Sequence, residues 1–117
     1  MNVLSSEWNI VFVSVDYEFC SEKNEKLKAE RGIDFNEIIY CMNNGGLLDV
    51  VQHHNKEKYA LQQFYVVDVN GYIHLVPFVQ NGDRVFLKTI FPSRKHTKKY
   101  QKQINRRKEN DYEKQKS

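Results

Sequence analysis

The stretch Gln63–Phe91, QFYVVDVNGYIHLVPFVQNGDRVFLKTIF, decides the fold of this 117-residue chain. Asn70–Gly71 and Asn81–Gly82 interrupt runs of β-branched and aromatic residues, and Asn-Gly is the strongest short signal for a hairpin turn because both positions need positive φ. Pro77 has no N–H to donate, so it must lie at an edge, at a bulge or where no ladder bond is made. The pattern predicts three antiparallel strands, Gln63–Val69, Tyr72–Val79 and Arg84–Phe91.

The two hairpins also predict which side chains share a face of the sheet. Pairing Val69 with Tyr72 and Val79 with Arg84 fixes the alternation through all three strands. One face then carries Tyr65, Val67, Val69, Tyr72, His74, Val76, Phe78, Val85, Leu87, Thr89 and Phe91. The other carries Phe64, Val66, Asp68, Ile73, Leu75, Val79, Arg84, Phe86, Lys88 and Ile90. Because charged side chains are seldom buried, we expect the first face to pack on helices and the second to be freer.

Two short helices are predicted ahead of these strands. Ser21 is a candidate N-cap for a helix over Glu22–Glu30, and Gly32 can take the left-handed conformation that ends it. Asp34, with Glu37 three residues later, resembles a capping box. The apolar residues of this second helix fall at helical spacing and include Phe35, Ile38, Ile39 and Met42. The run Asn43–Gly46 is expected to stop it.

Further strands and a basic helix complete the predicted architecture. Asn9–Val15 and Leu47–Gln52 have strand composition, and His53–Leu61 is a polar loop. Ser93 is a candidate N-cap for a helix to about Lys108, whose apolar contacts are Tyr100 and Ile104. The predicted fold class is α+β, with two N-terminal helices and a C-terminal basic helix on an antiparallel sheet of about four to five strands. Residues 1–108 are expected to form one domain, with 1–8 a loose leader and 109–117 a polar tail.

Charge is distributed unevenly along the chain. Residues 93–117 contain ten Lys/Arg against Glu109, Asp111 and Glu113, whereas residues 1–92 contain eight Lys/Arg and twelve Asp/Glu. Such a separation favours contact with a polyanion, because neutralisation of phosphates dominates the affinity of proteins for nucleic acids. A solvated basic tail accounts for the charge equally well.

Several classes of protein are disfavoured by the sequence. No run of about 18 apolar residues is present, and Ile10–Val15 lacks the features of a signal peptide, so we expect a cytoplasmic protein. Cys20 and Cys41 have no metal-ligand spacing and are expected to be buried thiols. The glycines match no phosphate-binding loop, and His53–His54 lacks the spacing of a zinc motif. No cofactor and no metal are predicted.

Cations and imidazoles converge on one end of the predicted sheet. The last strand delivers Lys88 and runs into Pro92–Ser93–Arg94–Lys95–His96, and His53 lies in a loop with Lys58 and Tyr59. Arginine and lysine can hold a scissile phosphate, a histidine can move protons on and off the sugar, and aromatic rings can stack on RNA bases. The composition is that of a metal-free ribonuclease. Residues with a predicted RNA-binding role are Lys58, Tyr59, Arg84, His96, Lys98, Lys99 and Lys102.

Each of these residues also has a structural explanation. His74 is expected to be a core histidine and Asp68 a salt-bridge partner. His53 and His54 can be solvated loop residues. The basic residues of the last helix favour a general phosphate- or partner-binding face over single catalytic roles.

In its ordered set of motifs the chain resembles BrnT-type toxins, within the RelE/ParE-like superfamily. The motifs run from about Val15 to Gln103 and comprise Asp16–Tyr17, Lys23–Asn24, Glu30–Arg31–Gly32–Ile33 with Phe35, Glu37 and Ile38, Gly45–Gly46–Leu47–Leu48–Asp49, His53 with Asn55, Lys58–Tyr59, Gln62, Asn70–Gly71–Tyr72, Val76–Pro77–Phe78, Phe86–Leu87–Lys88–Thr89–Ile90, Pro92–Ser93–Arg94–Lys95 and Lys99–Tyr100. His54 departs from the pattern, since many relatives have proline there.

The resemblance implies a RelE-like fold and an endoribonuclease toxin that inhibits translation in a type II toxin–antitoxin system. Carried over by position, it assigns the catalytic site to His53, Lys88, Arg94, Lys95 and Tyr100. It implies RNA as substrate, a DNA-binding antitoxin of ribbon-helix-helix type as partner, and no membrane. The apolar residues of the freer sheet face suggest that the antitoxin or a second copy of the chain covers it.

Two alternatives to a ribonuclease remain. The basic helix can serve a non-catalytic module that binds nucleic acid or an acidic protein. A ParE-like topoisomerase inhibitor can have the same fold, because fold does not set function.

Overall fold

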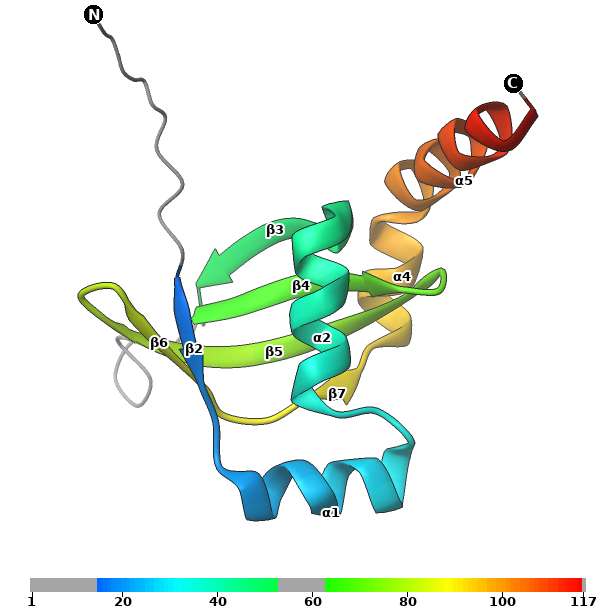
Figure 1. The fold of residues 1–117 in the computed structure, drawn as a ribbon. Helices are drawn as coiled ribbons and strands as arrows, with labels where there is room; N and C mark the ends of the chain where they lie inside the picture. Colours follow the sequence, from blue (N-terminus) through cyan, green and yellow to red (C-terminus); the bar gives the residue numbers. More distant parts are fainter. Residues whose placement is uncertain (1–14, 53–62, 117) are drawn as a thin grey trace, which may run out of the picture.

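A computed structural model of the chain describes residues 15–52 and 63–116, with side chains as far as Glu109. It has an α+β fold in which helices lie on both sides of an open, six-stranded, mostly antiparallel sheet (Figure 1). The strands are β2 (Asp16–Glu18), β3 (Leu47–Gln52), β4 (Gln63–Val69), β5 (Tyr72–Asn81), β6 (Arg84–Leu87) and β7 (Phe91–Pro92). The helices are α1 (Ser21–Arg31), α2 (Phe35–Cys41), α4 (Arg94–Lys99) and α5 (Gln101–Lys116), and a π-helical turn, Met42–Gly46, follows α2.

The strands lie in the order β2-β6-β5-β4-β3, and β7 also pairs with β5. The predicted strand at 47–52, the first hairpin and its pairing of Val69 with Tyr72 are confirmed. The second hairpin is tighter than predicted, because Arg84 pairs with Asn81 and not with Val79. This change of two residues preserves the alternation, so the predicted faces survive. The strand predicted at 9–15 and the loop at 53–61 lie outside the described residues, except for Val15.

One strand that the sequence did not predict joins the sheet at its edge. β2 pairs with β6 in parallel, with Tyr17 opposite Val85. It adds a short neighbour beyond the predicted antiparallel strands, and β2 and β3 therefore form the two edges of the described sheet.

The prediction of a continuous strand from Arg84 to Phe91 is wrong, and Pro77 explains why. The register that opposes Phe78 to Leu87 would next oppose Pro77 to Lys88. The Lys88 N–H donates to the Pro77 carbonyl at 2.8 Å, but proline has no N–H to complete the pair. The strand ends there, and a second short strand, Phe91–Pro92, resumes pairing at Leu75 and His74.

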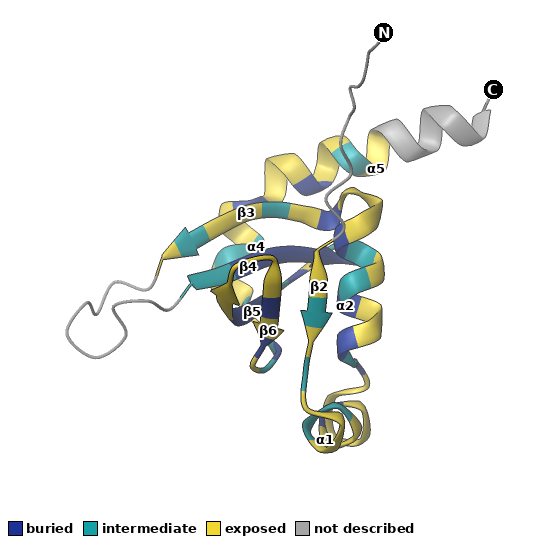
Figure 2. Cartoon of the chain, turned by 60° about the vertical axis from the view of Figure 1, so that its left-hand side comes forward, coloured by how far each residue is buried: buried dark blue, intermediate teal, exposed yellow. Residues whose placement is uncertain are grey.

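The face predicted to meet helices does pack against them. Val67, Val76 and Leu87 are fully buried, and they share a core with Phe35 and Ile38 of α2. Ile90 joins this core because the chain leaves the strand at Lys88, which reverses the predicted placement of Ile90 and Phe91. Burial is most continuous along β4 (Figure 2).

The opposite face is covered in part: its Val79, Arg84, Phe86 and Lys88 are exposed, as expected of a freer face, but its central residues are buried. Val66, Ile73 and Leu75 form a second core with Tyr100 and Ile104 of the C-terminal helical segment. α2 and α4 therefore lie on opposite sides of the sheet (Figure 1). Tyr100 and Ile104 are the two residues that pack the C-terminal helical segment onto the sheet. Leu48, Val51 and Phe91 complete the apolar contact around them.

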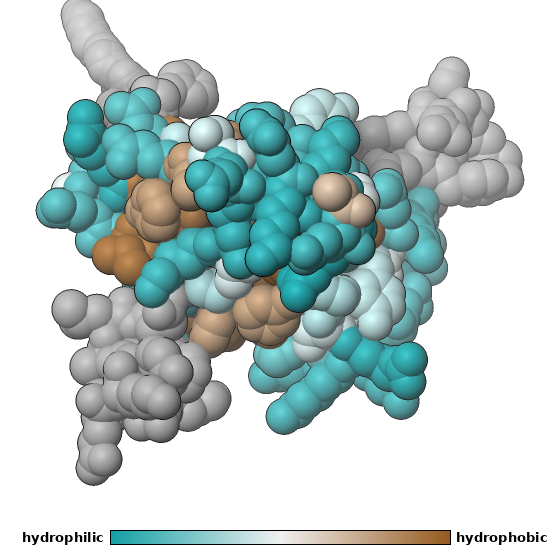
Figure 3. Space-filling model, turned by 90° about the horizontal axis from the view of Figure 1, so that it is seen from below, coloured by the Kyte–Doolittle hydropathy of each residue, from teal (hydrophilic) through white to brown (hydrophobic). Residues whose placement is uncertain are grey.

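The caps of the N-terminal helices follow the predicted chemistry with one change. The Asp34 side chain accepts a hydrogen bond from the Glu37 N–H at 2.9 Å, and Gly32 is left-handed with a φ of 72°. Cys20, not Ser21, is the N-cap of α1, and its side chain makes no capping bond. α1 buries only Leu27. Seen from below, much of the molecular surface is hydrophilic (Figure 3).

Candidate nucleic-acid interface

The basic C-terminal segment forms two consecutive helices, α4 and α5, that meet at Tyr100. Ser93 caps α4 as predicted, because its side chain accepts a hydrogen bond from the His96 N–H at 3.1 Å. Tyr100 leaves helical geometry, with φ of −102° and ψ of 17°. The segment predicted as one helix is therefore broken after one and a half turns.

Contacts along one side of these helices hold them on the sheet. The Ile73 N–H donates to Thr97 Oγ1 at 2.9 Å, and the Tyr100 hydroxyl donates to Asp49 Oδ2 at 2.7 Å. Ile104 is fully buried, and Arg107 forms an ion pair with the buried Asp68. Asp68 is thus a salt-bridge partner, as the sequence analysis favoured.

The other sides of the two helices carry the positive charge. Within residues 93–109, eight Lys/Arg stand against the single carboxylate of Glu109, and all of them except Arg107 are exposed. None of these seven exposed cations makes an ion pair with any described residue, and all but Lys108 lie on α4 and the first turns of α5: Arg94, Lys95, Lys98, Lys99, Lys102 and Arg106. Since the anchoring contacts use the opposite side, these cations face solvent. Figure 2 shows exposed positions along the described part of α5.

His96 lies among these cations in a defined setting. Its Nδ1 is 2.8 Å from Ser93 Oγ, and its ring stacks on Tyr100 with centroids 6.4 Å apart. Burial, reinforced by the charges of Lys99 and Lys95, lowers the pKa of His96. The imidazole is therefore mainly neutral at pH 7, and it can exchange hydrogen bonds with a ligand without adding charge.

Tyr100 is buried, with 7% of its surface exposed, and its hydroxyl proton is committed to Asp49. Burial, the hydrogen bond to Asp49 and the charge of Asp49 raise the pKa of Tyr100 to about 12. A phenol in this setting anchors the helix, and a catalytic role would require the bond to Asp49 to break. Lys99 Nζ lies 5.7 Å from the centre of the ring.

Two other predicted site residues lie at different distances from α4. Two backbone hydrogen bonds mark where each segment leaves strand β5. The N–H of the exposed Lys88 donates to the Pro77 carbonyl, and the N–H of Ser93, at the start of α4, donates to the Ile73 carbonyl four residues along β5. Strand β5 rises about 3.3 Å per residue, so Lys88 emerges about 13 Å from the start of α4. Arg84, opposite Asn81, emerges about 26 Å away on the same scale.

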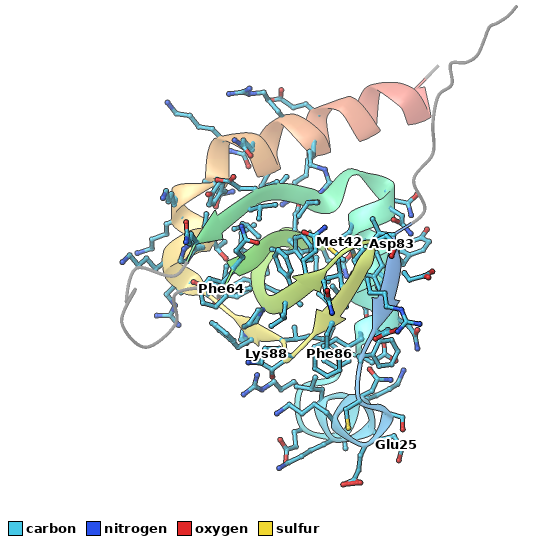
Figure 4. All side chains as sticks on the ribbon, turned by 90° about the vertical axis from the view of Figure 1, so that its left-hand side faces the viewer. Glu25, Met42, Phe64, Asp83, Phe86 and Lys88 are labelled. Atoms are coloured by element: carbon cyan, nitrogen blue, oxygen red, sulfur yellow. The ribbon has the colours of Figure 1, made fainter. Side chains whose placement is uncertain are left out.

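Arg84 is therefore separated from the cationic helices. It forms an ion pair with Glu18 at 3.4 Å beside β2, and Figure 4 places the neighbouring Asp83 on the far side of the sheet from α4. The structure brings together Arg94, Lys95, His96, Lys98, Lys99 and Lys102 and leaves Arg84 apart. The predicted residues His53, Lys58 and Tyr59 lie outside the described residues.

A cleft beside α5 was not found by the sequence analysis. It has a volume of about 380 Å³ and lies where α5 passes the end of α2 and the β4–β5 turn. Its lining residues are Tyr40, Cys41, Asn44, Asp68, Asn70, Gly71, Arg107 and Lys108. No sequence pattern connects these residues, because the cleft forms only when three separate segments pack together.

These features define an α+β protein whose two C-terminal helices present a cationic surface behind an open sheet. In the chain's described part, no helix has the length and apolar character needed to cross a membrane, and no three His, Cys, Asp or Glu side chains group as metal ligands. No family model, no curated protein and no solved structure matches the chain. The resemblance to BrnT-type toxins stays a prediction.

Proposed function

We propose that the protein binds RNA through α4 and the first turns of α5. The observation that carries this proposal is the division of the helices into two sides. One side is fixed to the sheet by Thr97, Tyr100 and Ile104, and the other presents six unpaired cations to solvent. Cations held on anchored helices, with no ion-pair partner in the described part of the chain, favour the binding of a polyanion.

The more specific proposal is that of a toxin in a type II toxin–antitoxin pair. On this hypothesis the protein is a RelE-like, metal-independent endoribonuclease that acts in the cytoplasm, and a ribbon-helix-helix antitoxin neutralises it. The resemblance of its motifs to BrnT-type toxins supports the hypothesis. The grouping of Arg94 and Lys95 with the neutral imidazole of His96 is compatible with it, because cations can stabilise the charge of a cleaving phosphodiester and an imidazole can move a proton.

RNA binding is tested by its dependence on salt. For single strands the logarithm of affinity falls with the logarithm of salt concentration by about 0.7 for each phosphate contact. K98Q/K99Q removes two exposed cations and should reduce this slope by about 1.4, which corresponds to a loss of roughly 25-fold in affinity at 0.1 M salt. The matched control is K23Q/K26Q, which makes the same change of charge on α1, across the sheet. Equal losses in the two variants would contradict a specific role for α4.

The toxin proposal is tested in cells. Expression without an antitoxin should arrest bacterial growth and fragment RNA, and Arg94→Ala should relieve the arrest while the protein stays folded, because Arg94 is exposed and unpaired among the described residues. RNA binding without cleavage or arrest would leave a binding module. Normal growth together with intact RNA would refute the toxin.

A further inference from the structure

The cleft beside the middle of α5 has the lining expected for a nucleotide. It measures about 380 Å³, which is at the small end of the range for ligand sites. It is formed by the side of α5 that carries Arg107 and Lys108, by Tyr40 at the end of α2 with Asn44 of the π-helical turn, and by the Asn70–Gly71 turn.

The cationic side chains in the cleft have more N–H donors than they have acceptors among the described residues. Arg107 gives one N–H to Asp68 and one to the Asn44 carbonyl, and a guanidinium has five N–H donors. Lys108 is exposed and forms no ion pair with a described residue. Asp68 is already occupied, because its other oxygen accepts the Gly71 N–H at 2.8 Å. Among the described residues that line it, the cleft therefore has cationic N–H donors without partners, and its one carboxylate, that of Asp68, is already hydrogen-bonded.

The turn that forms one wall allows Lys108 to approach. Gly71 has a φ of 89°, and a Cβ placed there would lie 3.1 Å from Lys108 Nζ. The absence of a side chain leaves room for the ammonium group over the turn. Beside Gly71, the exposed Asn70 side chain makes no hydrogen bond within the described part of the chain and can read the edge of a base.

Tyr40 supplies the aromatic element. It lines the cleft and is 68% exposed, and no core packing accounts for a large aromatic residue at this position. Exposed aromatic rings beside cations are the usual platform for unpaired bases of single strands. An acidic peptide would also match the cations, but it would have no use for the ring and the amide.

The same helix connects the cleft to the cationic surface. Lys102 and Arg106 lie on α5 between Lys99 and Lys108. At 1.5 Å per residue, Lys99 and Lys108 are about 13 Å apart along the helix. Because Arg107 lies on the side of α5 that faces the sheet, a strand on the exposed cations has to cross α5 beside Lys108 to enter the cleft.

We propose that the cleft holds one unpaired nucleotide of the bound RNA, with the base against Tyr40 and a phosphate on Lys108 and Arg107. This inference rests on the proposed RNA-binding function. The proposed function requires only contacts between cations and phosphates, and this inference adds a binding site for one base.

The test compares Tyr40→Ala on RNA with and without bases. The probes are fluorescent oligouridylate and oligoadenylate of about ten nucleotides, and the matching oligomer of abasic ribose phosphates. Stacking of one base predicts a loss of about 5- to 160-fold on at least one base-bearing probe and less than about twofold on the abasic probe. Tyr40→Phe, which keeps the ring, should retain wild-type affinity. The control is Phe86→Ala, which removes an aromatic residue that is 41% exposed on β6 (Figure 4). It should change the affinity for neither the base-bearing probes nor the abasic probe.

The outcomes separate this inference from the proposed function. Wild-type protein that binds neither base-bearing probe refutes both. If wild-type protein binds RNA but Tyr40→Ala binds it equally well, or loses affinity equally on the abasic probe, the nucleotide site is refuted and RNA binding by α4 and α5 stands.

Discussion

Replacing Arg107 by methionine should destabilise the domain more than the loss of any other cation in its basic segment. Asp68 exposes only 5% of its side chain and accepts from Arg107 and from the Gly71 N–H. Removing the guanidinium leaves one carboxylate oxygen without a donor in a nearly dry site. Loss of one partner of a buried ion pair costs about 3–5 kcal/mol. Since Arg107 itself is 32% exposed, water can partly replace it, and we expect about 2–3 kcal/mol.

The assay is urea denaturation followed by circular dichroism. The matched control is Arg106→Met, because Arg106 is the adjacent residue, exposed and unpaired among the described residues, and its loss should change the free energy of unfolding by less than about 0.5 kcal/mol. Asp68→Asn combined with Arg107→Met removes the stranded charge and should be more stable than Arg107→Met alone. If Arg107→Met costs no more than Arg106→Met, the ion pair does not hold α5 on the sheet.

Two further changes test the anchor and the packing. Tyr100→Phe should lower the free energy of unfolding by about 1 kcal/mol at pH 8. Because folding raises the pKa of Tyr100 to about 12, the wild type should lose this extra stability as the pH rises from 10 towards 12. Urea titrations in which the difference between the two proteins stays constant over that range would contradict the pH dependence. Gly46→Ala should cost about 1–3 kcal/mol, since its Cβ would lie 2.7 Å from the Cys41 carbonyl oxygen and 2.9 Å from that of Asp68. Gly32→Ala is the comparison for strain without contact, because its Cβ meets nothing within 4 Å and only its positive φ costs about 1–2 kcal/mol. A Gly46→Ala variant that melts at the wild-type temperature would show that the close backbone contact at Gly46 is unimportant.

Local signals predicted the elements whose causes are local. The Asp34 cap and the apolar spacing after it gave α2, and Asn70–Gly71 gave the first hairpin. Each signal lies within a few residues of the structure that it produces, so the sequence alone was enough.

Features that depend on distant residues were missed. The strand from Arg84 ends at Leu87 because Pro77, ten residues earlier than Leu87, cannot complete the next pair. The parallel addition of β2 depends on a strand far along the chain. Neither is visible in the composition of the segment concerned.

In the candidate site, too, the features with local causes were predicted and those that depend on distant residues were missed. Ser93 and the cations that follow it were identified as one basic helix because they are contiguous in sequence. The partners that seat it, Asp49 and Ile73, come from other strands, and the cleft with Tyr40 is formed by three separate segments. The sequence placed the charges on a helix and identified Tyr100 and Ile104 as its apolar contacts, which is confirmed, but it could not show which residues of the sheet they meet.

The attachment of α4 and α5 to strands β3, β4 and β5 links ligand binding to the integrity of the whole domain. The binding surface would be lost whenever the strands separate, so only the folded chain would hold a polyanion tightly. By mass action, a ligand at a hundred times its dissociation constant would then raise the free energy of unfolding by about 2.7 kcal/mol. A melting temperature that rises with RNA concentration would accordingly report occupancy without any label on either molecule.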